Sequence, residues 1–284
     1  MTALTRLAGL QRADGLFGAT IMMRDGRELD DTNGFVTALV LRHLRHAPRT
    51  PRLDAVIGAA LDGLARCEVP GSGGAYAFWP DGARPDWARA VPADVDDTAL
   101  ILTELHRHGR LDRDAVLRRI CHVMLPWRVR QRGLDQMPPW IVEGSFLTWI
   151  GTRGAMGGAA PNVVDCCVNA NVAALLAMID ARHLPGYDSA LATILQGLAW
   201  ASDEAIRLDA LTPFYPSPRA LLDAVEHAVE CGADGLRPAL VHLRAMPARL
   251  LDRSAGICRD AYGRTIWHAP AVEAAAALAL PIAA

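Results

Sequence analysis

The sequence predicts an all-α protein in which about five to six helical hairpins close into a single α/α toroid. Three observations lead to this fold class. Apolar residues recur with the spacing of amphipathic helices along most of the 284-residue chain. Segments with the alternating pattern of strands are sparse. A short acidic stretch that precedes an apolar helix occurs more than once, which indicates an internal repeat.

The repeat places polar residues where each inner helix is expected to begin. We expect these starts near Asp31, Asp97, Cys167, Arg219 and His268. The helical pattern also predicts helices over 53–66, 113–124 and 236–251, and a final helix over 271–280. If the hairpins stack in a ring, the inner helix starts all face one mouth. A concave mouth lined by polar groups is where a site is expected.

We interpret residues 1–284 as one toroid domain that carries an irregular insertion around 126–161. This insertion is rich in Trp, Pro and Gly and is longer than most loops of a compact domain. Part of it, from about Val142 to Ile150, is expected to be helical.

The charged residues exclude several functions. The formal net charge is −2, so no basic field is available to attract nucleic acid. All 29 basic residues are arginine, because the sequence contains no lysine. The absence of lysine excludes a Schiff-base lysine and a phosphate-binding Gly-Lys-Ser/Thr loop. No Gly-x-Ser-x-Gly nucleophile motif is present.

The cysteines and the apolar segments indicate a cytoplasmic protein. The six cysteines are scattered, and none forms a Cys-x-x-Cys pair, so neither a disulfide framework nor a zinc ribbon is indicated. The first residues lack the apolar centre of a signal peptide. No apolar run reaches the ~18 residues of a membrane span.

The acidic stretch whose residues are best suited to catalysis is Asp94-Val-Asp96-Asp97-Thr-Ala99. Asp and Thr are favoured at helix starts, and an apolar helix follows. Adjacent carboxylates do not all ionise easily, and burial raises their pKa further. A carboxylic acid that stays protonated beside anionic neighbours is a general acid. The simpler interpretation is a solvated helix start capped by these acids.

This Asp-x-Asp-Asp-Thr-Ala motif resembles that of the class II terpene cyclases of the squalene–hopene cyclase type. Gln11, Asp14, Gly15 and Gly18 also match the repeat of that family, with Phe17 in place of the usual Trp. The resemblance implies that Asp96 donates a proton to an alkene or epoxide, supported by Asp94 and Asp97. It implies protonation-initiated cyclisation of an isoprenoid or isoprenoid-containing small molecule, without a cofactor. The family generally builds its site between two barrels, whereas this chain has the length for one.

Further candidates for substrate binding lie at the expected helix starts and among the aromatic residues. Trp rings stabilise cations through their faces, and buried polar groups need partners. The candidates are Asp31, Trp79, Trp87, Asp165, Asn169, Tyr215, Trp267 and His268.

Two alternatives remain open at this stage. The β subunits of protein prenyltransferases share the toroid and bind zinc through an Asp-x-Cys pair and a later His, which Asp165, Cys167 and His268 match in type. Three protein ligands and one open position are the pattern of catalytic zinc. The other alternative is a non-catalytic toroid that binds a ligand. The oligomeric state does not follow from the sequence.

Overall fold

The computed structural model describes residues 2–88, 91–131, 137–151, 162–254, 256–260 and 265–279. Within these residues the chain is mostly helical, and one small antiparallel sheet joins its first and last segments. The buried apolar side chains form one cluster that extends from Leu7 to Ala275. No helix among the described residues is both long and apolar enough to cross a membrane.

Five helices correspond to the expected inner helices, and each begins close to its predicted position. They are α2 (Gly34–Leu44), α4 (Val95–Arg107), α7 (Cys166–Met178), α10 (Pro218–Glu230) and α13 (Pro270–Ala279). Four of them begin with a polar N-cap whose side chain accepts a hydrogen bond from a backbone N–H of the first turn. These caps are Asn33, Asp94, Asp165 and Ser217. Capping therefore explains why polar residues recur at the inner helix starts.

The other helices lie beside the inner ones. They are α1 (Ala3–Leu10), α3 (Pro51–Ala65), α5 (Arg113–Arg119), α8 (Tyr187–Ala201), α9 (Ala205–Leu211), α11 (Arg237–Ala245) and α12 (Ala248–Leu251). After α5 the chain continues through a π-helical turn (Ile120–Met124) and a 3₁₀ turn (Leu125–Trp127). A further 3₁₀ turn (Asp234–Leu236) precedes α11.

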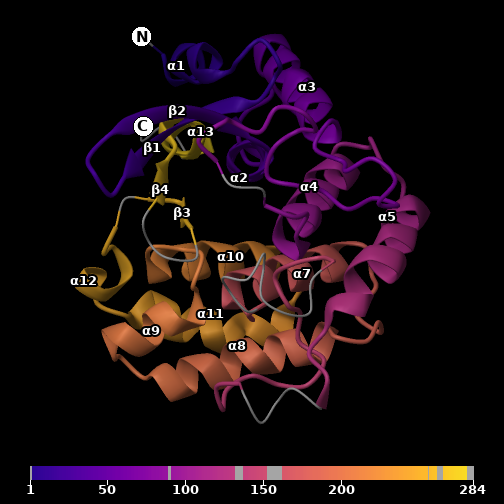
Figure 1. Ribbon diagram of the computed structural model, residues 1–284, viewed down its shortest axis with the longest axis vertical. Coiled ribbons are helices and arrows are strands. Elements are labelled where there is room, and N and C mark those ends of the chain that lie inside the picture. Colours follow the sequence, from indigo (N-terminus) through magenta and orange to yellow (C-terminus); the bar gives the residue numbers. More distant parts are fainter. Residues whose placement is uncertain are drawn as a thin grey trace.

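The five helices pack against one another in succession. α13 packs against α2, α2 against α4, α4 against α7, and α7 against α10. An ion pair between Arg45 at the end of α2 and Glu230 at the end of α10 links the last of these helices back to α2. α7 is buried on nearly all sides, as its Ala, Val, Leu and Cys residues predict. Figure 1 shows α1, α3 and the sheet in its upper part, with α8, α9 and α11 in its lower part.

The prediction of an all-α chain was wrong for the segment before α2. Strands β1 (Phe17–Met23) and β2 (Glu28–Asn33) form a hairpin. Strand β4 (Thr265–His268) pairs with the other edge of β1, and β3 (Cys258–Arg259) pairs with the outer edge of β4. β1 buries alternate residues, which is the period of a strand. An Asp-Gly turn at Asp25 and Gly26 connects the hairpin. Asp31 therefore lies on a strand, and α2 begins three residues later, after the cap Asn33.

The helix expected from Val142 to Ile150 was also wrong. This segment is extended and forms isolated bridges between Arg128 and Phe146, Asp94 and Trp149, and Leu147 and Val164. The reason lies outside the segment, because the amide of Asn169 in α7 binds both the N–H and the C=O of Phe146. Those backbone groups are then unavailable for a helix. Two parts of the irregular insertion, 132–136 and 152–161, lie outside the described residues.

Candidate active site

The three acids of the motif lie in the first turn of α4 and are almost completely buried. Asp94 is the N-cap, and its Oδ1 accepts a hydrogen bond of 2.6 Å from the N–H of Asp97. Its backbone carbonyl accepts from the hydroxyl of Thr98. The exposed fractions are 6% for Asp94, 7% for Asp96 and 1% for Asp97, which excludes the simple interpretation of a solvated helix start.

Asp96 is held by side chains from two other inner segments. Its Oδ1 accepts a hydrogen bond of 2.7 Å from the amide of Asn171 in α7. Its Oδ2 accepts a short hydrogen bond from the hydroxyl of Tyr215, just before α10. Behind Asn171 lies the buried guanidinium of Arg42 in α2, which donates to the amide oxygen of Asn171 at 2.6 Å. This contact fixes the orientation of the Asn171 amide, so that its NH₂ group faces Asp96.

The environment of the cluster favours retention of protons. Burial raises the pKa of Asp94 to about 7, the charge of Asp96 adds to this rise, and a hydrogen bond with Asp97 opposes it. Burial and the charge of Asp94 raise the pKa of Asp97 well above its usual range. Burial also raises the pKa of Asp96, while Asn171, Tyr215 and Arg42 lower it. Since the carboxyls repel one another when ionised, the cluster keeps at least one proton near neutral pH.

Asp96 differs from its neighbours in how its anion is stabilised. Two donors bind its oxygens, and a guanidinium lies behind one of them. An acid in this setting is protonated because it is buried, yet its carboxylate is stabilised once the proton has left. These are the two properties that a general acid needs.

A chain of aromatic rings, which we call the aromatic chain, extends from Tyr215 away from Asp96. The ring centroids of Tyr215 and Phe35 are 5.9 Å apart, and those of Phe35 and Phe78 are 6.0 Å apart. Phe78 then contacts Trp79 at 4.7 Å and Trp267 at 5.6 Å. Trp87 lies beyond both indoles, at 6.2 Å from Trp79 and 6.4 Å from Trp267. The structure thus groups Trp79, Trp87, Tyr215 and Trp267, four of the predicted residues.

Asp31 lies at the far end of the aromatic chain. Trp79 donates its indole N–H to Oδ1 of Asp31 at 2.8 Å, and Trp267 donates to Oδ2 at 2.9 Å. The amide of Asn33 also donates to Oδ2, at 2.8 Å. Asp31 therefore orients two indoles, those of Trp79 and Trp267, that lie far apart in the sequence.

Asp165 and Asn169 serve the backbone. Asp165 caps α7 by accepting from the N–H groups of Cys167 and Val168, and its other oxygen accepts from the N–H of Phe214 at 3.2 Å. Burial, helped by the charge of Asp96, raises its pKa to about 7. Asn169 is occupied by the backbone of Phe146 and by the carbonyl of Asp165. Both residues therefore fix the backbone around the start of α7.

The zinc alternative is not supported by this geometry. His268 lies on β4 opposite Thr20, and the residues the structure describes contain no group of three His, Cys, Asp or Glu side chains arranged to hold a metal ion. Both oxygens of Asp165 already accept backbone hydrogen bonds.

Three residues around the acid were not predicted as site residues from the sequence, namely Arg42, Phe35 and Phe78. Arg42 had a usable signal, because an arginine within the apolar helix Gly34–Leu44 must find buried partners. Asn171 lies two residues after Asn169 in a similarly apolar segment. The sequence around Arg42 and Asn171 does not indicate which side chains they bind.

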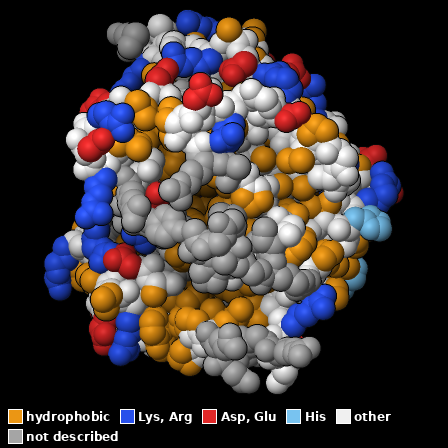
Figure 2. All heavy atoms as spheres, viewed as in Figure 1, with side chains coloured by type: hydrophobic (Ala, Val, Ile, Leu, Met, Phe, Trp, Pro, Cys, Tyr) orange, Lys and Arg blue, Asp and Glu red, His pale blue; other side chains and the backbone are white. Residues whose placement is uncertain are grey.

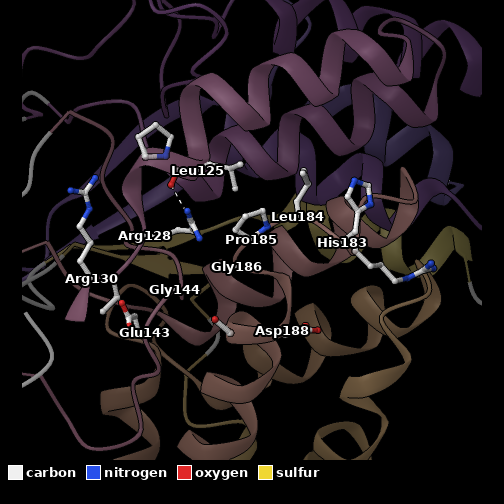
Figure 3. A pocket seen from close by; sticks show the side chains of 14 residues that line it. Leu125, Arg128, Arg130, Glu143, Gly144, His183, Leu184, Pro185, Gly186 and Asp188 are labelled. Atoms are coloured by element: carbon white, nitrogen blue, oxygen red, sulfur yellow. Dashed lines mark hydrogen bonds between the residues drawn. The ribbon is translucent and has the colours of Figure 1, made fainter. Parts of the chain in front are cut away.

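The face shown in Figure 2 has hydrophobic side chains around its middle and charged side chains mainly toward its edge. A separate pocket of about 570 Å³ lies between the α7–α8 connection and the segment that follows α5. Figure 3 shows Arg128 in this pocket, donating to the carbonyl of Leu125, with Arg130, Glu143, His183 and Asp188 also at its lining. None of the predicted site residues lines it, so the candidate active site is the acid cluster with the aromatic chain.

The fold of this chain is similar to that of a type II terpene cyclase of known structure. The chain matches the structure of a variant of the type II terpene cyclase MstE from Scytonema in complex with its product, merosterolic acid A. The TM-score is 0.51 at 13% identity, over 98% of this chain and 75% of that one. A protein from Actinoplanes matches with a TM-score of 0.51 at 18% identity, over 99% of this chain and 75% of that one. At these identities the likeness concerns the fold.

A comparison of the sequence with protein-family models finds no match. A search of curated proteins finds none either.

Proposed function

We propose that this protein is a class II terpene cyclase with a single α/α toroid, in which Asp96 is the general acid. The substrate is an isoprenoid or an isoprenoid-containing small molecule with a terminal alkene or epoxide. The observation that carries the proposal is the setting of Asp96, a buried carboxyl with a donor on each oxygen at one end of an aromatic chain. The similar fold of MstE, which was captured with a terpenoid product, supports it.

The reaction begins when Asp96 transfers its proton to the less substituted carbon of the terminal alkene or to the epoxide oxygen. In the alkene, the π electron pair forms the new C–H bond and leaves a tertiary cation; in the epoxide, the C–O bond to the tertiary carbon breaks and its electron pair stays on the protonated oxygen. The carboxylate of Asp96 remains bound by Asn171 and Tyr215, with Arg42 behind Asn171. The next double bond of the substrate attacks the cation and closes a ring. Water takes a proton from the final cation, whose C–H electron pair becomes the last double bond, and the carboxylate of Asp96 regains a proton from solvent.

The neighbouring acids have different parts in this proposal. Asp94 holds the first turn of α4 through its bond to the N–H of Asp97. Asp97, which is the most deeply buried of the three, retains its proton and so limits the negative charge beside Asp96. The aromatic chain offers ring faces to the migrating positive charge.

The test is incubation of the purified protein with linear isoprenoids and their diphosphates, of several lengths, in deuterated water. We expect a cyclic product with one deuterium at the carbon that Asp96 protonates. Asp96→Asn removes the acid and is expected to abolish this product. Asp114→Asn, the same change at an exposed first-turn residue of α5, is the matched control and is expected to leave the product unchanged.

No turnover of any isoprenoid, with both variants folded, would contradict the proposal and would favour a toroid that only binds its ligand.

A further inference from the structure

The clearest feature that the acid chemistry does not use is the buried carboxylate of Asp31. It is 4% exposed and accepts three hydrogen bonds, from the indoles of Trp79 and Trp267 and from the amide of Asn33. An indole N–H only donates, so both oxygens of Asp31 act as acceptors, as they do in the ionised form. We call Asp31, Trp79 and Trp267 the indole clamp.

This anion has no cationic partner among the residues the structure describes. No ion pair in that part of the chain includes Asp31, although the exposed Asp30 beside it pairs with Arg12. The nearby thiol of Cys258 is neutral, because burial and the charges of Asp97, Asp31 and Asp96 raise its pKa well above the usual value. A buried charge without an opposite charge is costly. Among the described residues, therefore, none supplies the opposite charge, and a cationic ligand can supply it.

The indole clamp also places this anion where it can attract a cation that binds against the aromatic rings. Each indole points its N–H edge at Asp31, and the rings of both contact Phe78 and Trp87. A carboxylate bound to the N–H edge adds negative potential to the ring face, which is the part of an indole that attracts cations. The aromatic chain connects these rings to Tyr215, which holds Asp96.

We propose that Asp31 is the counter-ion for the cationic intermediate and acts through the indoles of Trp79 and Trp267. The inference rests on the proposed function, since it assigns the far end of the same site. Asp96 creates the positive charge at one end of the aromatic chain, and Asp31 attracts it toward the other. Asp31 is a positioning residue, because the indoles stand between it and the ligand.

The test measures preference for a cation without requiring turnover. Two probes are titrated into the full chain, and tryptophan fluorescence or calorimetry gives their affinities. One is a hydroxyhexyl-trimethylammonium ion, and the other is its uncharged analogue with a tert-butyl group in place of the trimethylammonium group. Their affinity ratio is the cation preference. We expect the unmodified protein to prefer the cation and Asp31→Asn to lose about tenfold of this preference, with the neutral probe unaffected.

Two further variants keep the test decisive. Asp30→Asn removes the same charge from an exposed neighbour and is expected to leave the preference unchanged. Trp267→Phe keeps an aromatic ring but removes one N–H donor to Asp31, so we expect a smaller loss of preference. This variant decides the question if Asp31→Asn does not fold.

An unmodified protein that binds both probes equally, or a preference that survives Asp31→Asn and Trp267→Phe, would overturn the inference. Its failure is distinct from failure of the proposed function. A cyclic product together with a preference independent of Asp31 refutes the counter-ion alone. A preference that depends on Asp31, in a protein that cyclises nothing, refutes the cyclase and leaves a cation-binding site.

Discussion

Tyr215→Phe is the sharpest test of how the site tunes its acid. The substitution removes only the hydroxyl that donates to Oδ2 of Asp96 and keeps the ring that contacts Phe35. The carboxylate of Asp96 loses one of two donors, whereas the protonated acid loses less. The pKa of Asp96 therefore rises in the variant, because the charged form is the one destabilised.

The size of the effect follows from the strength of the lost contact. A hydrogen bond to a charged group contributes about 1.5–3 kcal/mol, which corresponds to about 1–2 pH units. Proton transfer develops the negative charge on Asp96, so the same energy is lost in the transition state. We expect the maximum rate to fall by about 10- to 100-fold.

The assay is the pH dependence of deuterated product formation in both proteins. In the proposed mechanism Asp96 must be protonated to act, so we expect activity to be lost as the pH rises through its pKa. The alkaline limb should therefore move upward by about 1–2 pH units in Tyr215→Phe, while the maximum falls. A lower rate with an unmoved alkaline limb, or a limb that moves downward, would refute the reasoning and leave Tyr215 as a packing residue.

Two further predictions concern stability. The pKa of Asp165 is about 7 in the fold against 3.8 as the ordinary value, so its protonated form contributes roughly 4 kcal/mol to stability at low pH, which is lost as the pH rises from about 4 to about 7. Asp165→Asn, which keeps a good N-cap, is expected to make the urea unfolding midpoint vary less with pH between about 4 and about 7. An unchanged pH dependence of the midpoint in the variant would contradict this assignment. Gly15→Ala is expected to destabilise by about 3 kcal/mol or more, because the residue has a positive φ and its Cβ would lie 2.1 Å from the carbonyl oxygen of Ala59. Gly26→Ala has a similar φ but open space around it, so equal unfolding midpoints for the two variants would argue against the steric reason.

The inner helix starts were predictable because capping is local. Asp94, Asp165 and the apolar helices after them belong to one short stretch each, and their N-cap bonds span two or three residues. The sheet was missed for the opposite reason. Asp30-Asp31-Thr32 has the letters of Asp96-Asp97-Thr98, but its strand is stabilised by pairing with β1, which in turn pairs with residues more than 240 positions away.

The place of Asp96 at a helix start was predictable, but its hydrogen-bond partners were not. Asp96 stands in a motif, whereas Asn171 and Tyr215 reach it from positions 75 and 119 residues further along the chain. The assignment of Asp31 to substrate binding stays a prediction. Because both oxygens of Asp31 accept hydrogen bonds from indoles, a substrate would contact the indoles and not the carboxylate itself. Trp79 and Trp267 have no spacing that indicates a shared partner.

The pairing of β1 with β4 has a consequence for how the chain is made. A ribosome releases β1 and β2 early, long before Thr265–His268 exists. Until then one edge of β1 has unpaired backbone groups, and such edges invite association with other chains. The same delay applies to Asp31, whose second indole arrives with β4. Nascent chains therefore complete the sheet and the indole clamp in one late step, and long-range closure of this kind is slow. We expect newly made chains to need protection of this edge during synthesis.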